Sequence, residues 1–186
     1  YIGNGASGGD AVTGPFEMSG GTFNKATGSQ IRVGSSGGNG FMTITGGTLN
    51  NDGSSEFQIG AGSGTEGTVT LGGIGTIQTN NWFSIGRSGG TGVLNVNGGN
   101  LNKTNGNSAF IVGDASTGTL NQTGGTITTN GEVWIGSGNS TGNYNMSGGT
   151  LHTDSWFVVG RNGGGTGTIT MTGGTINNTG TGSDFV

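Results

Sequence analysis

A pair of adjacent glycines recurs along this chain at nearly constant intervals. The pairs begin at Gly20, Gly46, Gly72, Gly98, Gly124, Gly148 and Gly173, so the intervals are 26, 26, 26, 26, 24 and 25 residues. A constant interval of this size is typical of proteins that stack one structural unit repeatedly. We therefore expect about seven stacked coils of 24 to 27 residues.

Short stretches of alternating apolar and polar residues flank each glycine pair. In one coil Met42-Thr43-Ile44-Thr45 precedes the pair, Thr48-Leu49-Asn50 follows it, and Phe57-Gln58-Ile59-Gly60 begins the next coil. Alternation with a period of two is the pattern of a half-buried strand. The chain is thus predicted to be all-β: a single parallel β-solenoid (β-helix) over residues 1–186, with three short strands per coil and a roughly triangular cross-section.

Composition agrees with a stack better than with a globule. Only 27% of the residues are hydrophobic and 48 are glycine, values that without a repeat would suggest disorder. A one-dimensional stack needs fewer apolar residues, because each coil buries them against its neighbours. With five basic residues and a net charge of -4, the chain has no basic surface for nucleic acid, and it has no apolar run long enough for membrane insertion.

The two ends carry parts of the first-strand motif. Tyr1-Ile2-Gly3 resembles the end of that motif, and Ser183-Asp184-Phe185-Val186 resembles its beginning. No atypical, polar capping coil is recognisable at either end. We therefore expect an uncapped solenoid, either a segment of a longer array or a subunit that stacks head to tail on itself. The predicted contact residues are Tyr1, Ile2, Phe185 and Val186.

The repeats resemble those of large bacterial surface and secreted proteins. The stretches that carry this resemblance are FSIGRSGGTGVLNVNGGNLN and FVVGRNGGGTGTITMTGGTIN. They are similar to autotransporter-associated β-strand repeats and to arrays in exosortase-sorted (PEP-CTERM) proteins. The resemblance implies a β-helical rod located outside the cell or on its surface, often with adhesive or matrix roles, and it implies no catalytic residues.

The acidic residues and the histidine do not form a catalytic or metal-binding pattern. A β-helical polysaccharide lyase needs a base beside acidic residues on one face. Here His152 occupies a position where other coils have Asn, Gln or Thr. The aspartates lie in loops of different coils at dissimilar positions: Asp10, Asp52, Asp114, Asp154 and Asp184. The glycine-rich turns also lack the aspartates of calcium-binding repeats. We predict no enzyme activity, no catalytic residues, no metal and no cofactor.

Polar residues at one outward position are expected to stack into a ladder. Its members are Thr43, Thr70, Asn95, Asn121, Asn145 and Thr170. A flat threonine array is a feature of ice-binding solenoids, but asparagine interrupts it in three coils. Stacked Asn and Thr side chains also stabilise any solenoid through hydrogen bonds between coils.

Several other side chains raise specific expectations. Trp82, Trp134 and Trp156 could stack on the sugars of a polysaccharide or contact a neighbouring rod, although packing at a corner is the simpler interpretation. Arg87 and Asp114 are predicted to form an ion pair between coils. Gln122 takes a position that is apolar in other coils, so it needs buried hydrogen-bond partners.

These observations favour a non-enzymatic, structural rod or filament subunit, extracellular or on the cell surface, whose open edges pair end to end. The alternative is an adhesin or glycan-binding stalk that uses exposed tryptophan. An ice-binding array and a β-helical lyase are less consistent with the residues present.

Overall fold

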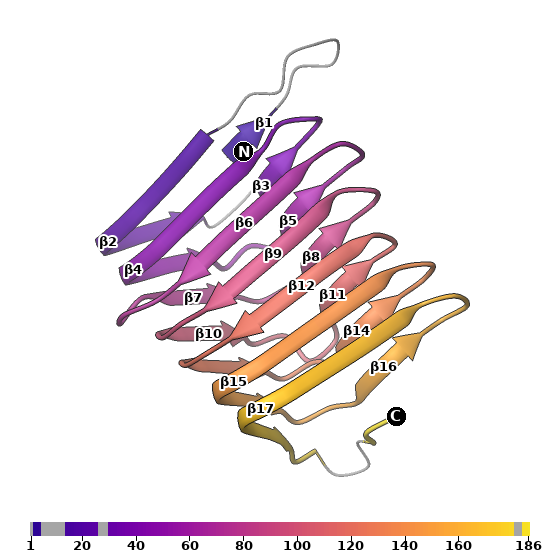
Figure 1. Cartoon of the computed structure of the whole chain (residues 1–186). Helices are drawn as coiled ribbons and strands as arrows, with labels where there is room; N and C mark the ends of the chain where they lie inside the picture. Colours follow the sequence, from indigo (N-terminus) through magenta and orange to yellow (C-terminus); the bar gives the residue numbers. More distant parts are fainter. Residues whose placement is uncertain (1, 5–13, 26–29, 181–183) are drawn as a thin grey trace.

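Two parallel sheets wind around a single core in the computed structural model, which describes residues 2–4, 14–25, 30–180 and 184–186 (Figure 1). The first sheet has the strand order β1 (Ile2–Asn4), β3 (Ile31–Ser35), β5 (Phe57–Ala61), β8 (Phe83–Arg87), β11 (Phe110–Asp114), β14 (Val133–Ser137) and β16 (Phe157–Arg161). Neighbours in this order are consecutive coils, which confirms the predicted parallel solenoid.

The second sheet bends at the glycine pairs. Its strands are β2 (Gly14–Lys25), β4 (Gly40–Asn51), β6 (Glu66–Leu71), β7 (Thr76–Thr79), β9 (Thr91–Val96), β10 (Asn100–Lys103), β12 (Thr117–Gln122), β13 (Thr126–Thr129), β15 (Thr141–Thr153) and β17 (Thr166–Asn178). In three coils the bend separates two strands, and in the others one long strand passes through it. With the first sheet, the two halves give the three predicted strand segments per coil.

The number of complete turns is slightly smaller than predicted. The first sheet has seven strands, and the steps between them make about six turns rather than the seven coils expected from the glycine pairs. The difference arises because each glycine pair marks one bend of the chain. A complete turn runs from one first-sheet strand to the next, so seven such strands enclose six turns.

Glycine is required at the bend because backbones of successive coils meet there. Gly47 has a φ of +78°, and a Cβ atom on it would lie 2.4 Å from the carbonyl oxygen of Gly21. Positive φ and such close backbone contact are both tolerated only by a residue without a side chain. The glycine pair therefore combines the two roles expected of it.

Columns of stacked side chains fill the core. A column here means the residues that occupy the same position in successive coils. Phe57, Phe83 and Phe110 are fully buried and stack with ring centroids 4.8 and 5.2 Å apart and planes inclined by 14°. Val133 and Phe157 continue the column. These phenylalanines thus lie on the buried side that the alternation of apolar and polar residues predicts for the apolar positions.

Gln122 is buried and satisfied, as its position requires. Its side-chain amide donates to the carbonyl oxygen of Thr150 at 3.0 Å and to that of Gly125 at 3.4 Å. The Tyr144 hydroxyl donates to its Oε1 at 2.6 Å. Burial raises the pKa of Tyr144, so this donor keeps its proton. Buried hydrogen-bond partners were predicted for Gln122, but Tyr144 was not identified as one of them.

Candidate functional site

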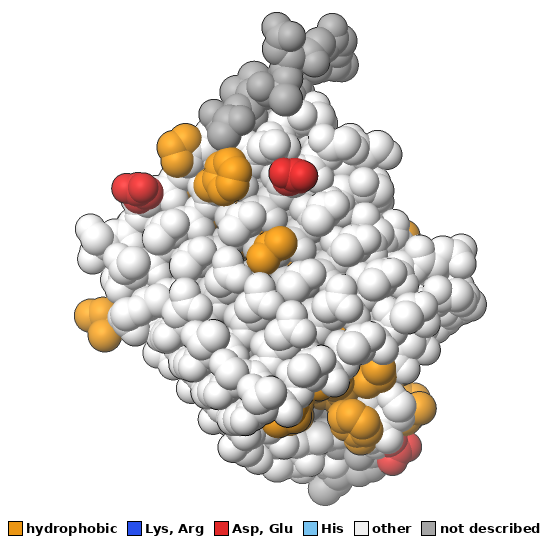
Figure 2. Space-filling model, viewed as in Figure 1, with side chains coloured by type: hydrophobic (Ala, Val, Ile, Leu, Met, Phe, Trp, Pro, Cys, Tyr) orange, Lys and Arg blue, Asp and Glu red, His pale blue; other side chains and the backbone are white. Residues whose placement is uncertain are grey.

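The register places the predicted outward ladder in a single column. Pairing runs from Thr43 through successive coils to Thr70, Asn95, Asn121, Asn145 and Thr170. The amide of Asn145 donates to Oδ1 of Asn121, and that of Asn121 to Oδ1 of Asn95, both at 2.9 Å. Because these bonds occupy polar groups within the column, they favour a stabilising role for it. In Figure 2 hydrophobic and charged side chains cover only a small part of this side of the molecule.

A more regular threonine column lies beyond the bend. The register aligns Thr22, Thr48, Thr76, Asn100, Thr126, Thr150 and Thr175. Sequence reasoning noted these residues only as outward neighbours of the core and did not treat them as a column. The recurrence of threonine directly after each glycine pair was the signal that could have identified it.

Trp82 and Trp134 come together, although they belong to coils two turns apart. Their ring centroids are 5.3 Å apart and the planes are inclined by 68°. The guanidinium of Arg161 lies 4.0 Å from the centre of the Trp134 ring, and the Trp134 Nε1 donates to Glu132 Oε2 at 2.6 Å. Glu132 also pairs with Arg161. Packing against Trp82, Arg161 and Glu132 thus explains the position of Trp134. The Arg161 guanidinium covers one face of the Trp134 ring.

The third tryptophan, Trp156, is an exposed side chain. Trp156 is 45% exposed and directly precedes β16. A hollow of about 290 Å³ lies beside Trp82 and Trp134, bordered by Glu132 and residues 106–109. Of the predicted glycan-contacting residues, the structure thus brings Trp82 and Trp134 into contact, and it places Trp156 in the coil next to that of Trp134, where the Trp156 carbonyl accepts a hydrogen bond from the Val133 amide. A sugar ligand for any of them stays a prediction.

The predicted ion pair between Arg87 and Asp114 is present. Arg87 Nε lies 3.5 Å from Asp114 Oδ2, and Arg87 Nη1 lies 2.9 Å from Glu56 Oε2. Burial raises the pKa of Asp114 more than the charge of Arg87 lowers it. Glu56 was missed because it lies in the coil on the other side of Arg87. All three residues belong to the first-sheet side, so the charged network is separate from the Thr and Asn columns.

His152 lies at a polar surface position, partly exposed, with its Nε2 3.4 Å from the Thr179 hydroxyl. Within residues 2–4, 14–25, 30–180 and 184–186, no group of three His, Cys, Asp or Glu side chains could hold a metal ion. Asp10 lies outside the described residues. The part of the chain that the structure describes also contains no helix long and apolar enough to cross a bilayer.

Lys103 is a buried cation that the sequence analysis did not single out. It is 1% exposed, and its ammonium donates to the backbone carbonyls of Asn105, at 2.6 Å, and Ser108. The lysine thereby ties down the loop that follows β10. Burial lowers its pKa to about 8, and Asp154 partly opposes that change.

The free energy of unfolding is expected to rise with pH between about 8 and 10, because the unfolded chain then holds a proton on Lys103 that the folded chain has lost. The gain attributable to Lys103 should stay below about 3 kcal/mol. Urea unfolding at several pH values should show this slope in the wild type. Lys103→Thr should lack it, since threonine occupies the equivalent position in the neighbouring coils, at Thr79 and Thr129. Equal slopes in both proteins would contradict the assignment.

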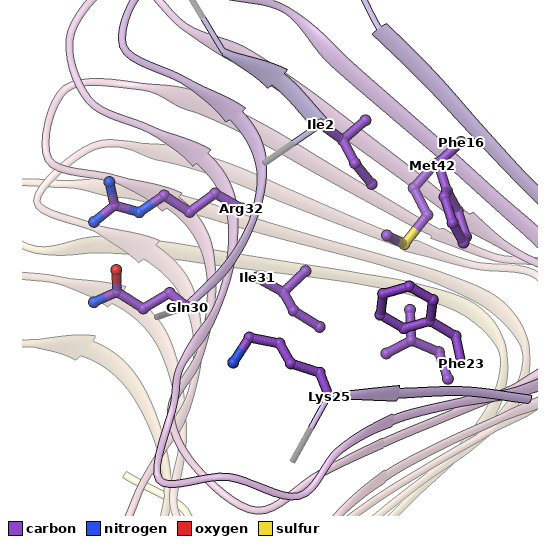
Figure 3. A pocket seen from close by; sticks show the side chains of 9 residues that line it. Ile2, Phe16, Phe23, Lys25, Gln30, Ile31, Arg32 and Met42 are labelled. Carbon is purple, nitrogen blue, oxygen red and sulfur yellow. The ribbon is translucent and has the colours of Figure 1, made fainter. Parts of the chain in front are cut away.

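The first coil contains a hollow of about 290 Å³. Figure 3 shows Ile2, Phe16, Phe23, Ile31 and Met42 pointing toward one another around it, with Lys25 at its edge and Gln30 and Arg32 directed away. The Lys25 Nζ is buried and has no hydrogen-bond partner among the described residues. Of the predicted end residues, Ile2 lines this hollow, while Tyr1 lies outside the described residues.

The last coil presents apolar side chains at the opposite end. Phe185 is 64% exposed and Val186 61%, and Met171 of β17 is 46% exposed. In Figure 2 apolar side chains gather at this end, close to the position marked C in Figure 1. The two predicted end contacts are therefore separated by the whole length of the stack.

Comparisons with family models, with curated proteins and with solved structures find no match for this chain. The resemblance to surface-protein repeats accordingly stays a prediction.

Proposed function

We propose that this chain is a non-enzymatic structural protein, a rod or filament subunit that pairs end to end through the open edges of its first and last coils. The observation that carries the proposal is that both ends expose apolar columns. Met171, Phe185 and Val186 are exposed at one end and Phe23 at the other. An exposed strand edge with apolar side chains is a template for pairing with another strand.

The interior supports a mechanical role. Each interior strand of the first sheet, from β3 to β14, pairs with the preceding and the following coil, so backbone hydrogen bonds run without interruption along the stack. The phenylalanine column and the asparagine ladder add side-chain contacts between the same coils. A unit held by both neighbours along its whole length resists bending and local opening better than one held by loops.

The proposed location is outside the cell or on its surface. The resemblance of the repeats to those of secreted and surface proteins supports it. The coil that covers each open edge would be a second copy or a further coil of the same repeat type, because either supplies strands at the matching spacing.

Purified protein at rising concentration is expected to form filaments with an axial repeat of about 4.8 Å, visible by electron microscopy and fibre diffraction. Met171→Lys should reduce this assembly, because it places a charge on an open end. Phe41→Lys is the matched control: Phe41 is 42% exposed but lies on the side of the rod in β4. Dispersed short rods at every concentration would overturn the end-to-end part of the proposal.

A further inference from the structure

A loop longer than its neighbours forms one wall of a hollow on the side of the rod. Residues 104–109 separate β10 from β11, whereas residues 80–82 separate β7 from β8 and residues 130–132 separate β13 from β14. A loop of six residues thus lies between two loops of three. Its additional residues lie on the surface, where Gly106 and Asn107 are exposed, and residues 106–109 line the hollow.

Contacts with its own coil and with the next coil hold this loop in place. The ammonium of Lys103 donates to the carbonyl oxygens of Asn105, at 2.6 Å, and Ser108. The side-chain amide of Asn130, in the next coil, donates to the Thr104 carbonyl at 3.1 Å. The loop is therefore anchored on both sides, and a ligand that binds against it need not first order it, which favours binding.

Trp82 and Trp134 supply aromatic surface to the same hollow. Both side chains are only partly buried, and both line its volume of about 290 Å³. Asn107, Ser108 and Glu132 add groups that form hydrogen bonds to this lining. Aromatic walls combined with a few polar groups are typical of sites that bind small organic ligands.

The charges beside the hollow are already paired within the protein. Glu132 is the one charged residue among those that line it, and Glu132 pairs with Arg161. The Arg161 guanidinium also lies 4.0 Å from the centre of the Trp134 ring, so it makes the contact with this ring that a cationic ligand would seek. Neither a cation nor an anion therefore meets an uncompensated charge here, and the arrangement favours a neutral, polar ligand.

We propose that this hollow binds a neutral sugar unit of a polysaccharide. A sugar ring presents C–H groups on its faces, which pack against an aromatic ring, and hydroxyl groups at its edge, which donate and accept hydrogen bonds. In the proposed complex the ring packs against Trp82, while its hydroxyls bond to Asn107 and Glu132. The volume suits about one or two sugar rings, because it lies near the lower limit for small-molecule pockets.

The proposed site is independent of the ends of the rod. Its residues come from the loops and strands around β8, β11 and β14, which are interior strands of the first sheet. The inference therefore goes beyond end-to-end assembly and adds a means by which the side of the rod attaches to a polysaccharide.

Affinity electrophoresis of the whole chain tests the site. The probes are native gels that contain hydroxyethyl cellulose, xylan, galactomannan or dextran, with alginate as an anionic comparison. The protein should migrate more slowly in at least one of the four neutral polysaccharides than in a gel without polysaccharide. Trp82→Ala should weaken this binding about tenfold or more, because it removes the surface on which the ring packs.

Two further variants separate sugar binding from the packing of the tryptophans. Asn107→Ala changes an exposed loop residue and should weaken binding about threefold to tenfold with an unchanged melting temperature. Phe41→Ala removes an exposed aromatic ring from β4, in the second sheet, and should leave binding unchanged. Circular dichroism checks that each variant keeps its β-sheet signal, and Asn107→Ala decides the test if Trp82→Ala does not fold.

Three results would each refute the sugar site. They are normal migration in all four neutral polysaccharides, retardation in alginate alone, and binding that Asn107→Ala leaves as strong as Phe41→Ala does. Filament growth is measured without polysaccharide, so failure of the sugar site leaves the proposed end-to-end assembly untouched, and failure of assembly leaves the sugar site untouched.

Discussion

Gly60→Ala is expected to lower the free energy of unfolding by more than about 4 kcal/mol. A Cβ atom at this position would lie 2.0 Å from the carbonyl oxygen and 2.4 Å from the carbonyl carbon of Thr91 in the next coil. Those atoms belong to a backbone held by pairing on both sides, so they cannot move without opening the stack. The φ of +66° adds strain of its own. Urea unfolding followed by circular dichroism measures the change.

Two glycines on the same molecule separate the clash from the strain. Gly64 has a φ of +71° but nothing within 4 Å of its added Cβ, so Gly64→Ala should cost about 1 to 2 kcal/mol. Gly163 has neither a positive φ nor a neighbour within 4 Å, and Gly163→Ala should change stability by less than about 0.5 kcal/mol. If Gly60→Ala cost no more than Gly64→Ala, the close approach between coils would not be rigid.

Phe83→Ala is expected to lower the free energy of unfolding by about 3 to 5 kcal/mol. The side chain is fully buried and stacks between Phe57 and Phe110. Its removal leaves a cavity in the middle of the column that the fixed spacing of the coils prevents from closing. Thermal or urea unfolding gives the value directly.

Phe83→Leu should cost much less, because the same column already accepts Ile31 and Val133. Phe41→Ala removes the same atoms from an exposed position and should change stability by less than about 0.5 kcal/mol. A loss from Phe83→Ala as small as that from Phe41→Ala would mean that the column is not the stabilising core.

The sequence by itself determined the features that depend on period. Alternation with a period of two assigns each residue to the inside or the outside, and the glycine interval sets the coil length, so membership of each column follows without coordinates. The inward phenylalanines, the outward Thr and Asn ladder and the Arg87–Asp114 pair were predictable for this reason. The number of complete turns was harder to predict from the sequence. The glycine pairs count the bends of the chain, and the number of bends exceeds the number of complete turns.

Only the tertiary structure decided where long side chains reach. Trp82 contacts Trp134 across two turns, Tyr144 bonds Gln122, and Lys103 turns inward to hold its loop. Such contacts depend on rotamers and on loop lengths that vary between coils, and no period encodes either.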